Sequence, residues 1–132
     1  MIAHLDAALA AITGDSGASS FNANDVRGAR AVFLVARAED GAPVGCGALR
    51  PLEDDIGEIK RMVACPGSGA GALLLAALEA HAIRLGYVEV RLSTRRINAR
   101  AVDFYRRHGY LEAPAWGKYV GNPVSVCLGK RL

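Results

Sequence analysis

Cysteine is scarce in this chain and is nowhere clustered. Among the 132 residues there are three cysteines and three histidines, and they form neither a Cys-x-x-Cys pair nor any spacing typical of metal ligands. The cysteines are Cys46, Cys65 and Cys127. An odd number of dispersed thiols is typical of a reducing compartment. We therefore expect free, mostly buried cysteines and no bound metal.

Long hydrophobic runs are also missing, and no leader peptide is expected. Hydrophobic residues make up 52% of the chain, yet no uninterrupted run approaches the roughly 18–20 residues that a membrane-spanning helix needs. The opening segment "MIAHLDAALAAITG" has no basic start and is interrupted by His4 and Asp6, unlike a signal peptide. These absences predict a cytoplasmic protein with no membrane contact.

Neither sign of charge is in large excess. Sixteen lysines and arginines against 13 aspartates and glutamates give a formal net charge of +3. No basic run is interleaved with stacking aromatics, so nucleic-acid binding is not expected, whereas a small anionic ligand is favoured. The length predicts a single domain over residues 1–132.

What the chain does contain is an alternation of strand-like and helix-like segments. The predicted strands are residues 31–38, 43–50, 57–64, 87–93 and 124–130, and the predicted helices are residues 70–85 and 99–108. An Asp-Gly turn joins the first two strands as a hairpin. Residues 4–12 also have helical apolar spacing, and the polar residues 13–29 predict a loop. The order predicts a mixed α/β domain.

The strand at residues 57–64 leads into a turn of small residues, "CPGSGAGA". Alternation along this strand places Ile59 on one face and Glu58 and Met62 on the other. A glycine turn that opens a helix lets backbone N–H groups converge on an anion. Two other interpretations stay open. The glycines could merely permit a tight turn, or they could form a dinucleotide-binding fingerprint with Glu89 as its acidic residue.

The segment "NARAVDFYRRHGY", residues 98–110, together with the preceding strand, turn and helix, resembles the GNAT superfamily of acetyltransferases. Members carry a helix of the form Asn-x-x-Ala-x-x-φ-Tyr-x-x-x-Gly-φ. The chain matches it at Asn98, Ala101, Phe104, Tyr105, Gly109 and Tyr110. The resemblance runs from about residue 30 to the C-terminus. It implies a GNAT-like mixed central sheet flanked by helices, and direct attack of a primary amine on the thioester of acetyl-CoA.

The resemblance also implies roles for individual residues. Tyr105 is expected to protonate the leaving CoA thiolate, and Glu58 to deprotonate the amine, often through water. A core aromatic at Tyr105 and an ion pair between Glu58 and Lys60, or a cation on a neighbouring strand, are the structural alternatives. The residues expected to bind acetyl-CoA are Met62, Val63, Ala64, Ser68, Gly69, Ala70, Gly71 and Asn98, and Asn98 is also expected to cap its helix.

Two departures from the family pattern stand out. Pro66 occupies the place of the family's Arg or Gln in the glycine turn, so a weakened phosphate cradle is expected, with Arg100 as the first candidate to replace the lost cation. If residues 4–12 are the family's first helix, the family's first strand is missing, and the exposed edge needs cover from a loop, from a partner chain in a homodimer or from a shortened neighbouring strand. A degenerate module with weak or no CoA binding and no catalysis is the alternative function.

The acceptor is expected to be the amine of a small molecule or a peptide. The tail from residue 112 onward is expected to line the acceptor side, with Trp116 and Tyr119 as candidate walls. Fold alone does not choose among amines.

Overall fold

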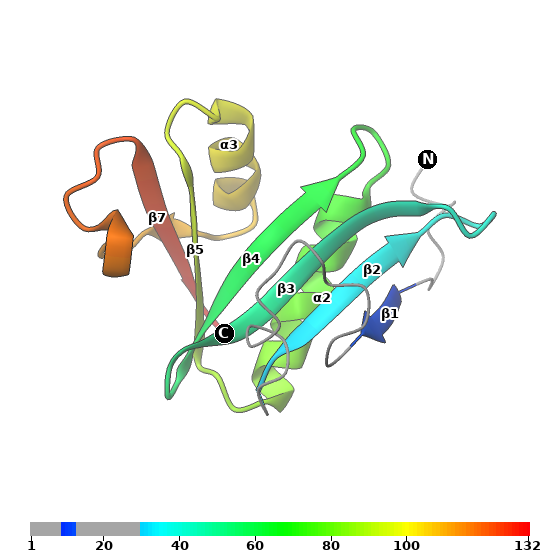
Figure 1. Cartoon of the computed structure of the whole chain (residues 1–132), viewed down its shortest axis with the longest axis horizontal. Coiled ribbons are helices and arrows are strands. Elements are labelled where there is room, and N and C mark those ends of the chain that lie inside the picture. Colours follow the sequence, from blue (N-terminus) through cyan, green and yellow to red (C-terminus); the bar gives the residue numbers. More distant parts are fainter. Residues whose placement is uncertain (1–8, 13–29) are drawn as a thin grey trace.

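A computed structural model describes residues 9–12 and 30–132, and its main feature is a seven-stranded sheet in the order β1-β2-β3-β4-β5-β7-β6 (Figure 1). The strands are β1 Leu9–Ile12, β2 Val32–Arg37, β3 Pro43–Glu53, β4 Ile56–Ala64, β5 Glu89–Arg95, β6 Leu111–Glu112 and β7 Ser125–Arg131. The helices are α2 Ala70–Arg84, α3 Ala99–Arg107 and the short 3-10 helix η2 Gly117–Tyr119. The predicted mixed α/β sheet flanked by helices is confirmed.

The short strand β1 corrects one expectation. Its residues pair antiparallel with β2, from Leu9 opposite Ala36 to Ile12 opposite Phe33. The expected helix was therefore wrong for residues 9–12, and so was the missing first strand that followed from it. Apolar residues in so short a segment fit both periodicities, and the backbone groups along the edge of β2 provide partners for a strand. Residues 4–8 of that helix and the expected loop at residues 13–29 lie outside the described residues.

Helix α2 covers one face of strands β2, β3 and β4 and forms the core with them (Figure 1). Its inward positions Leu74, Leu78 and Ala82 are fully buried, as their spacing predicts. The helix lies close to β3 because that strand presents glycine at the contact. A Cβ built on Gly45 would lie 2.9 Å from Cδ1 of Leu74, so no larger side chain fits there without a shift.

Strand β4 contains a β-bulge at Arg61, which changes the side chains that face α2. The pairing with β3 shifts register beside it, and Arg61 adopts a φ of 59°. The extra residue moves Met62 to the face of Ile59, where it packs against the core. Simple alternation, which placed Met62 on the face of Glu58, was wrong because an inserted residue leaves no mark on the apolar pattern.

Strands β4 and β5 pair in parallel over three residues only, from Ile56 opposite Glu89 to Glu58 opposite Arg91. Beyond this seam the two strands diverge, and β5 pairs with β7 along its whole length (Figure 1). The glycine turn and α3 follow the diverging ends of β4 and β5. The sheet is therefore splayed, and it opens at the carboxyl ends of the two strands.

Three expectations from the composition concern membrane-spanning helices, cysteines and metal ligands. None of the described helices is both long and apolar enough to cross a membrane. All three cysteines are free, but the expectation that they are mostly buried was wrong, because only Cys127 is buried, while Cys46 is partly buried and Cys65 is exposed. The part of the chain that the structure describes contains no group of three or more His, Cys, Asp or Glu residues placed to hold a metal ion.

Candidate functional site

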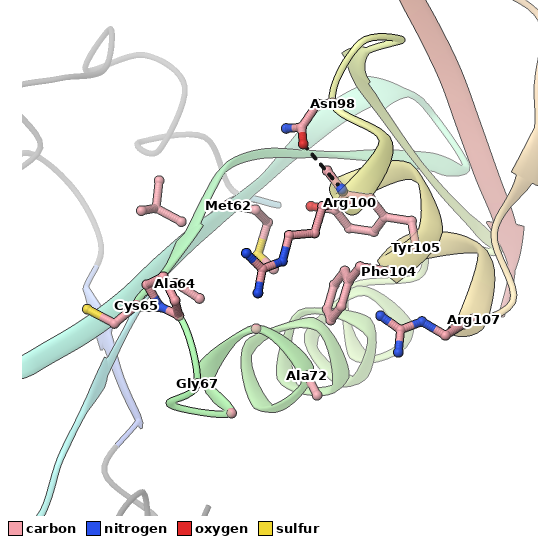
Figure 2. Close-up of a pocket in the computed structure, with 15 residues that line it drawn as sticks. Met62, Ala64, Cys65, Gly67, Ala72, Asn98, Arg100, Phe104, Tyr105 and Arg107 are labelled. Atoms are coloured by element: carbon pink, nitrogen blue, oxygen red, sulfur yellow. Dashed lines mark hydrogen bonds between the residues drawn. The ribbon is translucent and has the colours of Figure 1, made fainter. Parts of the chain in front are cut away.

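A pocket of about 440 Å³ lies between the end of β4, the glycine turn and α3 (Figure 2). It brings together most of the residues predicted to bind acetyl-CoA with the predicted catalytic tyrosine. These residues are Met62, Val63, Ala64, Gly69, Gly71, Asn98 and Tyr105. Ser68, Ala70 and Glu58 do not line the pocket.

The glycine turn depends on backbone conformations that only glycine adopts easily. Gly67 and Gly69 have φ angles of 75° and 78°, in the left-handed region. Gly71 is needed for a different reason, because a Cβ there would lie 3.3 Å from the ring of Phe104 on α3. The turn therefore needs its glycines for folding, whether or not a ligand also uses its backbone.

Hydrogen bonds inside the glycine turn reduce the number of backbone N–H groups that could bind a phosphate. The Ser68 hydroxyl donates to the carbonyl oxygen of Cys65 at 2.7 Å and accepts from the amide of Ala70 at 3.1 Å. The Ser68 amide itself donates to the Cys65 carbonyl at 3.2 Å. The amides of Gly71 and Ala72, in the first turn of α2, keep no acceptor within the helix. Fewer backbone N–H groups are therefore available near the pocket than the four predicted, those of Ser68, Gly69, Ala70 and Gly71.

Asn98 holds the start of α3, as its place in the sequence predicts. Its Oδ1 accepts a hydrogen bond from the amide of Ala101 at 3.3 Å. The cap fixes the first turn of α3 at the rim of the pocket, and the dashed line in Figure 2 marks it.

Tyr105 lies in the last turn of α3 with 8% of its surface exposed. Its hydroxyl makes no hydrogen bond to any described residue. Since every fully buried side-chain oxygen or nitrogen of the described residues has a hydrogen-bond partner, the Tyr105 hydroxyl is not fully buried. The hydroxyl is therefore open to the pocket that Tyr105 lines. Burial raises the pKa of Tyr105 to about 12, so the phenol remains a proton donor at neutral pH.

A polar network that the sequence analysis missed lies directly behind this residue. The Tyr110 ring meets the Tyr105 ring edge to face at 5.7 Å between centroids. The buried Tyr110 hydroxyl donates to Oε2 of Glu79 on α2 at 2.8 Å, and Nζ of Lys130 on β7 lies 3.0 Å from Oε1 of the same carboxylate. The helix motif marks Tyr110 only as an aromatic core position and indicates neither of its distant partners.

Glu58 is buried, with 5% of its surface exposed, at the last residue pair of the β4–β5 seam. It points away from α2, because its neighbour Ile59 packs in the core. Its Oε1 lies 3.7 Å from Nε of Arg50, which stands opposite it on β3. The expected ion pair with a cation on a neighbouring strand is thus present. Glu58 marks the point where the strands begin to separate, outside the pocket that holds Tyr105.

The charges around the pocket are of one sign. Arg100 and Arg107 of α3 both line it, and its lining contains no carboxylate. Arg100, the first candidate for a substitute cation, reaches this pocket, whereas the other basic residues Arg95, Arg96 and Lys118 do not line it.

A second pocket of about 380 Å³ lies on the side where the acceptor is expected. Tyr119 lines it, and Trp116 stacks edge to face on Tyr119 with 5.6 Å between ring centroids. The exposed ion pair between Arg96 and Glu112, 3.7 Å apart, also belongs to this lining. Of the two predicted wall residues, Tyr119 therefore lies at a concave surface, and Trp116 packs against it without lining the pocket.

The dinucleotide-binding interpretation does not fit the structure. Glu89 pairs with Ile56 at the start of β4, whereas the glycine turn follows the other end of that strand. The Glu89 carboxylate is also engaged by Nε of Arg91 at 2.7 Å. An acidic residue that bound a ribose beside the turn would have to lie near the turn.

Comparisons with known proteins agree with this geometry. The family model described as "Acetyltransferase (GNAT) family" matches residues 7–110. An IAA acetyltransferase of Azospirillum brasilense is 36% identical over 104 residues, which are 76% of this chain and 67% of the relative.

Solved structures show the same fold. A Klebsiella pneumoniae protein described as an acyl-CoA N-acyltransferase matches with a TM-score of 0.74 at 33% identity, over 89% of this chain and 79% of that chain. A GNAT family acetyltransferase from Elizabethkingia anophelis, solved with acetyl-CoA bound, matches with a TM-score of 0.69 at 15% identity, over 96% of this chain and 99% of that chain.

Proposed function

The chain belongs to the GNAT family of acetyltransferases, and we propose that it uses acetyl-CoA as co-substrate to acetylate a primary amine. One observation carries the proposal. A single pocket at the diverging ends of β4 and β5 connects the open hydroxyl of Tyr105 with the glycine turn. A thioester and a phosphate-bearing tail are the two ends of acetyl-CoA, and the two ends of this pocket suit them.

The residues around the pocket fit such a co-substrate. The end of β4, Met62 to Ala64, no longer pairs with β5, so its backbone on that side is available to the amide groups of a pantetheine arm. The first amides of α2 and the guanidinium of Arg100 would hold phosphate oxygens at the other end. The acceptor amine, of a small molecule or a peptide, would approach from the side of Glu58 and Tyr119.

In the proposed reaction the neutral amine nitrogen attacks the thioester carbonyl carbon. A C–N bond forms, the C–S bond breaks, and its electron pair leaves on sulfur. Tyr105 donates a proton to that sulfur. An ordinary thiol has a pKa near 8.5, well below the pKa of about 12 that burial gives Tyr105. Proton transfer from the phenol to the thiolate is therefore uphill, and it is completed only when the phenolate takes up a proton again. The proton that the amine loses, passed to Glu58 through water and on to solvent, balances this step.

The test is release of free thiol from acetyl-CoA in the presence of a panel of amines. We expect Tyr105→Phe to lower kcat by about ten-fold to a thousand-fold with little change in acetyl-CoA affinity, because a proton donor acts on the transition state. The matched control is Tyr87→Phe, which removes a tyrosine hydroxyl that donates to the Arg30 carbonyl away from the pocket. An unchanged kcat in Tyr105→Phe would contradict the assigned role.

A second candidate is a GNAT-fold module without catalysis, and Pro66 is the observation that favours it. This residue lines the pocket where the family carries a hydrogen-bonding side chain. Binding of CoA without thiol release for any amine in the panel would support the module and contradict the enzyme.

A further inference from the structure

We infer that helix α3 supplies the positive charge that the glycine turn lacks, with Arg100 binding the diphosphate of CoA and Arg107 binding its 3′-phosphate. This inference rests on the proposed use of acetyl-CoA. It narrows the role of Arg100 to the diphosphate and adds Arg107 as the residue that recognises the 3′-phosphate. It also predicts that the protein distinguishes CoA from dephospho-CoA.

The turn by itself is a poor site for a polyanion. The stretch from Met62 to Ala72 contributes no lysine, arginine or histidine to the pocket, and Pro66 brings not even a backbone N–H. The Ser68 and Ala70 amides are already engaged within the turn. Charge-assisted hydrogen bonds, which are about twice as strong as neutral ones, must therefore come from another element.

One face of α3 has the required charge. Arg100, Phe104 and Arg107 follow one another at spacings of four and three residues, so they share a face of the helix. Figure 2 shows Arg100 reaching toward the end of β4, while Arg107 lies beyond Phe104 along the helix. Both arginines line the pocket, whose lining carries no Asp or Glu. Two guanidinium groups without a counter-charge favour an anionic ligand.

Neither arginine is committed to a carboxylate elsewhere in the described part of the chain. Other basic side chains are paired, such as Arg91 with Glu89 at 2.7 Å and Lys130 with Glu79 at 3.0 Å. Arg107 makes only a long bond from Nε to the Asp103 carbonyl, at 3.4 Å and within its own helix. Both guanidinium groups can therefore bind a ligand without breaking an ion pair to a described residue.

The distance between Arg100 and Arg107 along α3 indicates that they bind different anionic groups of CoA. Seven residues of α-helix span about 10 Å, so the two side chains meet a ligand at separate points. CoA carries two anionic groups on one ribose, the 5′-diphosphate and the 3′-phosphate. Arg100 lies on the side of the pocket that reaches the turn, which assigns it the diphosphate and leaves the 3′-phosphate to Arg107.

The experiment is calorimetric titration of CoA and of dephospho-CoA into the wild type, Arg100→Gln, Arg107→Gln and the control Arg106→Gln. Arg106 is an exposed neighbour on α3 that does not line the pocket. We expect Arg100→Gln to weaken both ligands by about ten-fold to a hundred-fold, the range for one hydrogen bond to a charged group. Arg107→Gln should weaken CoA alone and remove the preference over dephospho-CoA, and Arg106→Gln should change neither.

The outcomes separate this inference from the proposed function. If the wild type binds both ligands equally, or if Arg107→Gln keeps the wild-type preference, the assignment of Arg107 is wrong while the acetyltransferase proposal stands. Equal affinities in Arg100→Gln and the wild type would overturn the assignment of Arg100 in the same way. Absence of CoA binding by the wild type, together with absence of thiol release, would overturn the proposed function itself.

Discussion

Tyr110→Phe is expected to destabilise the protein by removing one hydrogen bond from the network behind Tyr105. The Tyr110 side chain is fully buried, and its hydroxyl donates to Oε2 of Glu79 at 2.8 Å. Burial and the neighbouring carboxylate raise the pKa of Tyr110, so the hydroxyl remains a donor across the usual range of pH. The substitution keeps the ring and removes only the donor.

The magnitude follows from the surroundings of the acceptor. A hydrogen bond to a charged group contributes about 1.5–3 kcal/mol. The Glu79 side chain keeps 18% exposure and its contact with Lys130, so water and the ammonium group replace part of what is lost. We therefore expect the free energy of unfolding to fall by about 1–2 kcal/mol, which for a domain of this size corresponds to roughly 3–10 °C in Tm.

The assay is a double-mutant cycle by urea unfolding at neutral pH, using the wild type, Tyr110→Phe, Glu79→Gln and the double variant. The two residues lie on different elements and meet through one bond, so a coupling of at least about 0.5 kcal/mol is expected. Losses that add within about 0.3 kcal/mol would refute the argument, because the hydroxyl and the carboxylate would then contribute independently.

Two further predictions concern β3 and β4. Gly47→Ala should lower the free energy of unfolding by about 1–3 kcal/mol through overpacking, as measured by urea unfolding. The added Cβ would lie 2.7 Å from Sδ of Met62 and 2.9 Å from Cδ1 of Leu78. An unchanged free energy of unfolding would mean that the bulged strand β4 moves aside without cost. Glu58→Gln should lower the acetylation rate most near neutral pH and recover as rising pH deprotonates the amine without help. A loss independent of pH would show that Glu58 serves only its ion pair with Arg50.

Elements whose boundaries rest on local chemistry were predictable from the sequence. The hairpin between β2 and β3 follows from Asp40-Gly41, where Gly41 has a φ of 88° and Asp40 Oδ1 accepts from the Ala42 amide at 2.9 Å. Both long helices began and ended close to the predicted residues, at α3 because Asn98 caps the first turn and Gly109 follows the last. Such signals act over a few residues and can be read from the chain directly.

Features that depend on distant partners could not be predicted in the same way. Residues 9–12 became a strand because β2 offers them an edge, and the bulge at Arg61 changed the face of Met62 without altering the apolar pattern. Glu79 and Tyr110 are separated by 31 positions in the sequence, so only the fold reveals their bond. In the glycine turn, the Ser68 hydroxyl bonds to backbone groups, and the Ala70 amide is therefore not free to bind a ligand. The residue types alone do not show these bonds.

The three-residue seam between β4 and β5 has a mechanical consequence. Beyond Glu58, β4 continues for six residues to Ala64 without pairing with β5. Six extended residues span about 20 Å, so a rotation of only about 5° around the seam displaces the glycine turn by about 2 Å relative to α3. The seam would thus act as a hinge and the rest of β4 as a lever. A long co-substrate could then enter and leave by a slight widening of the opening, with no need for a separate lid.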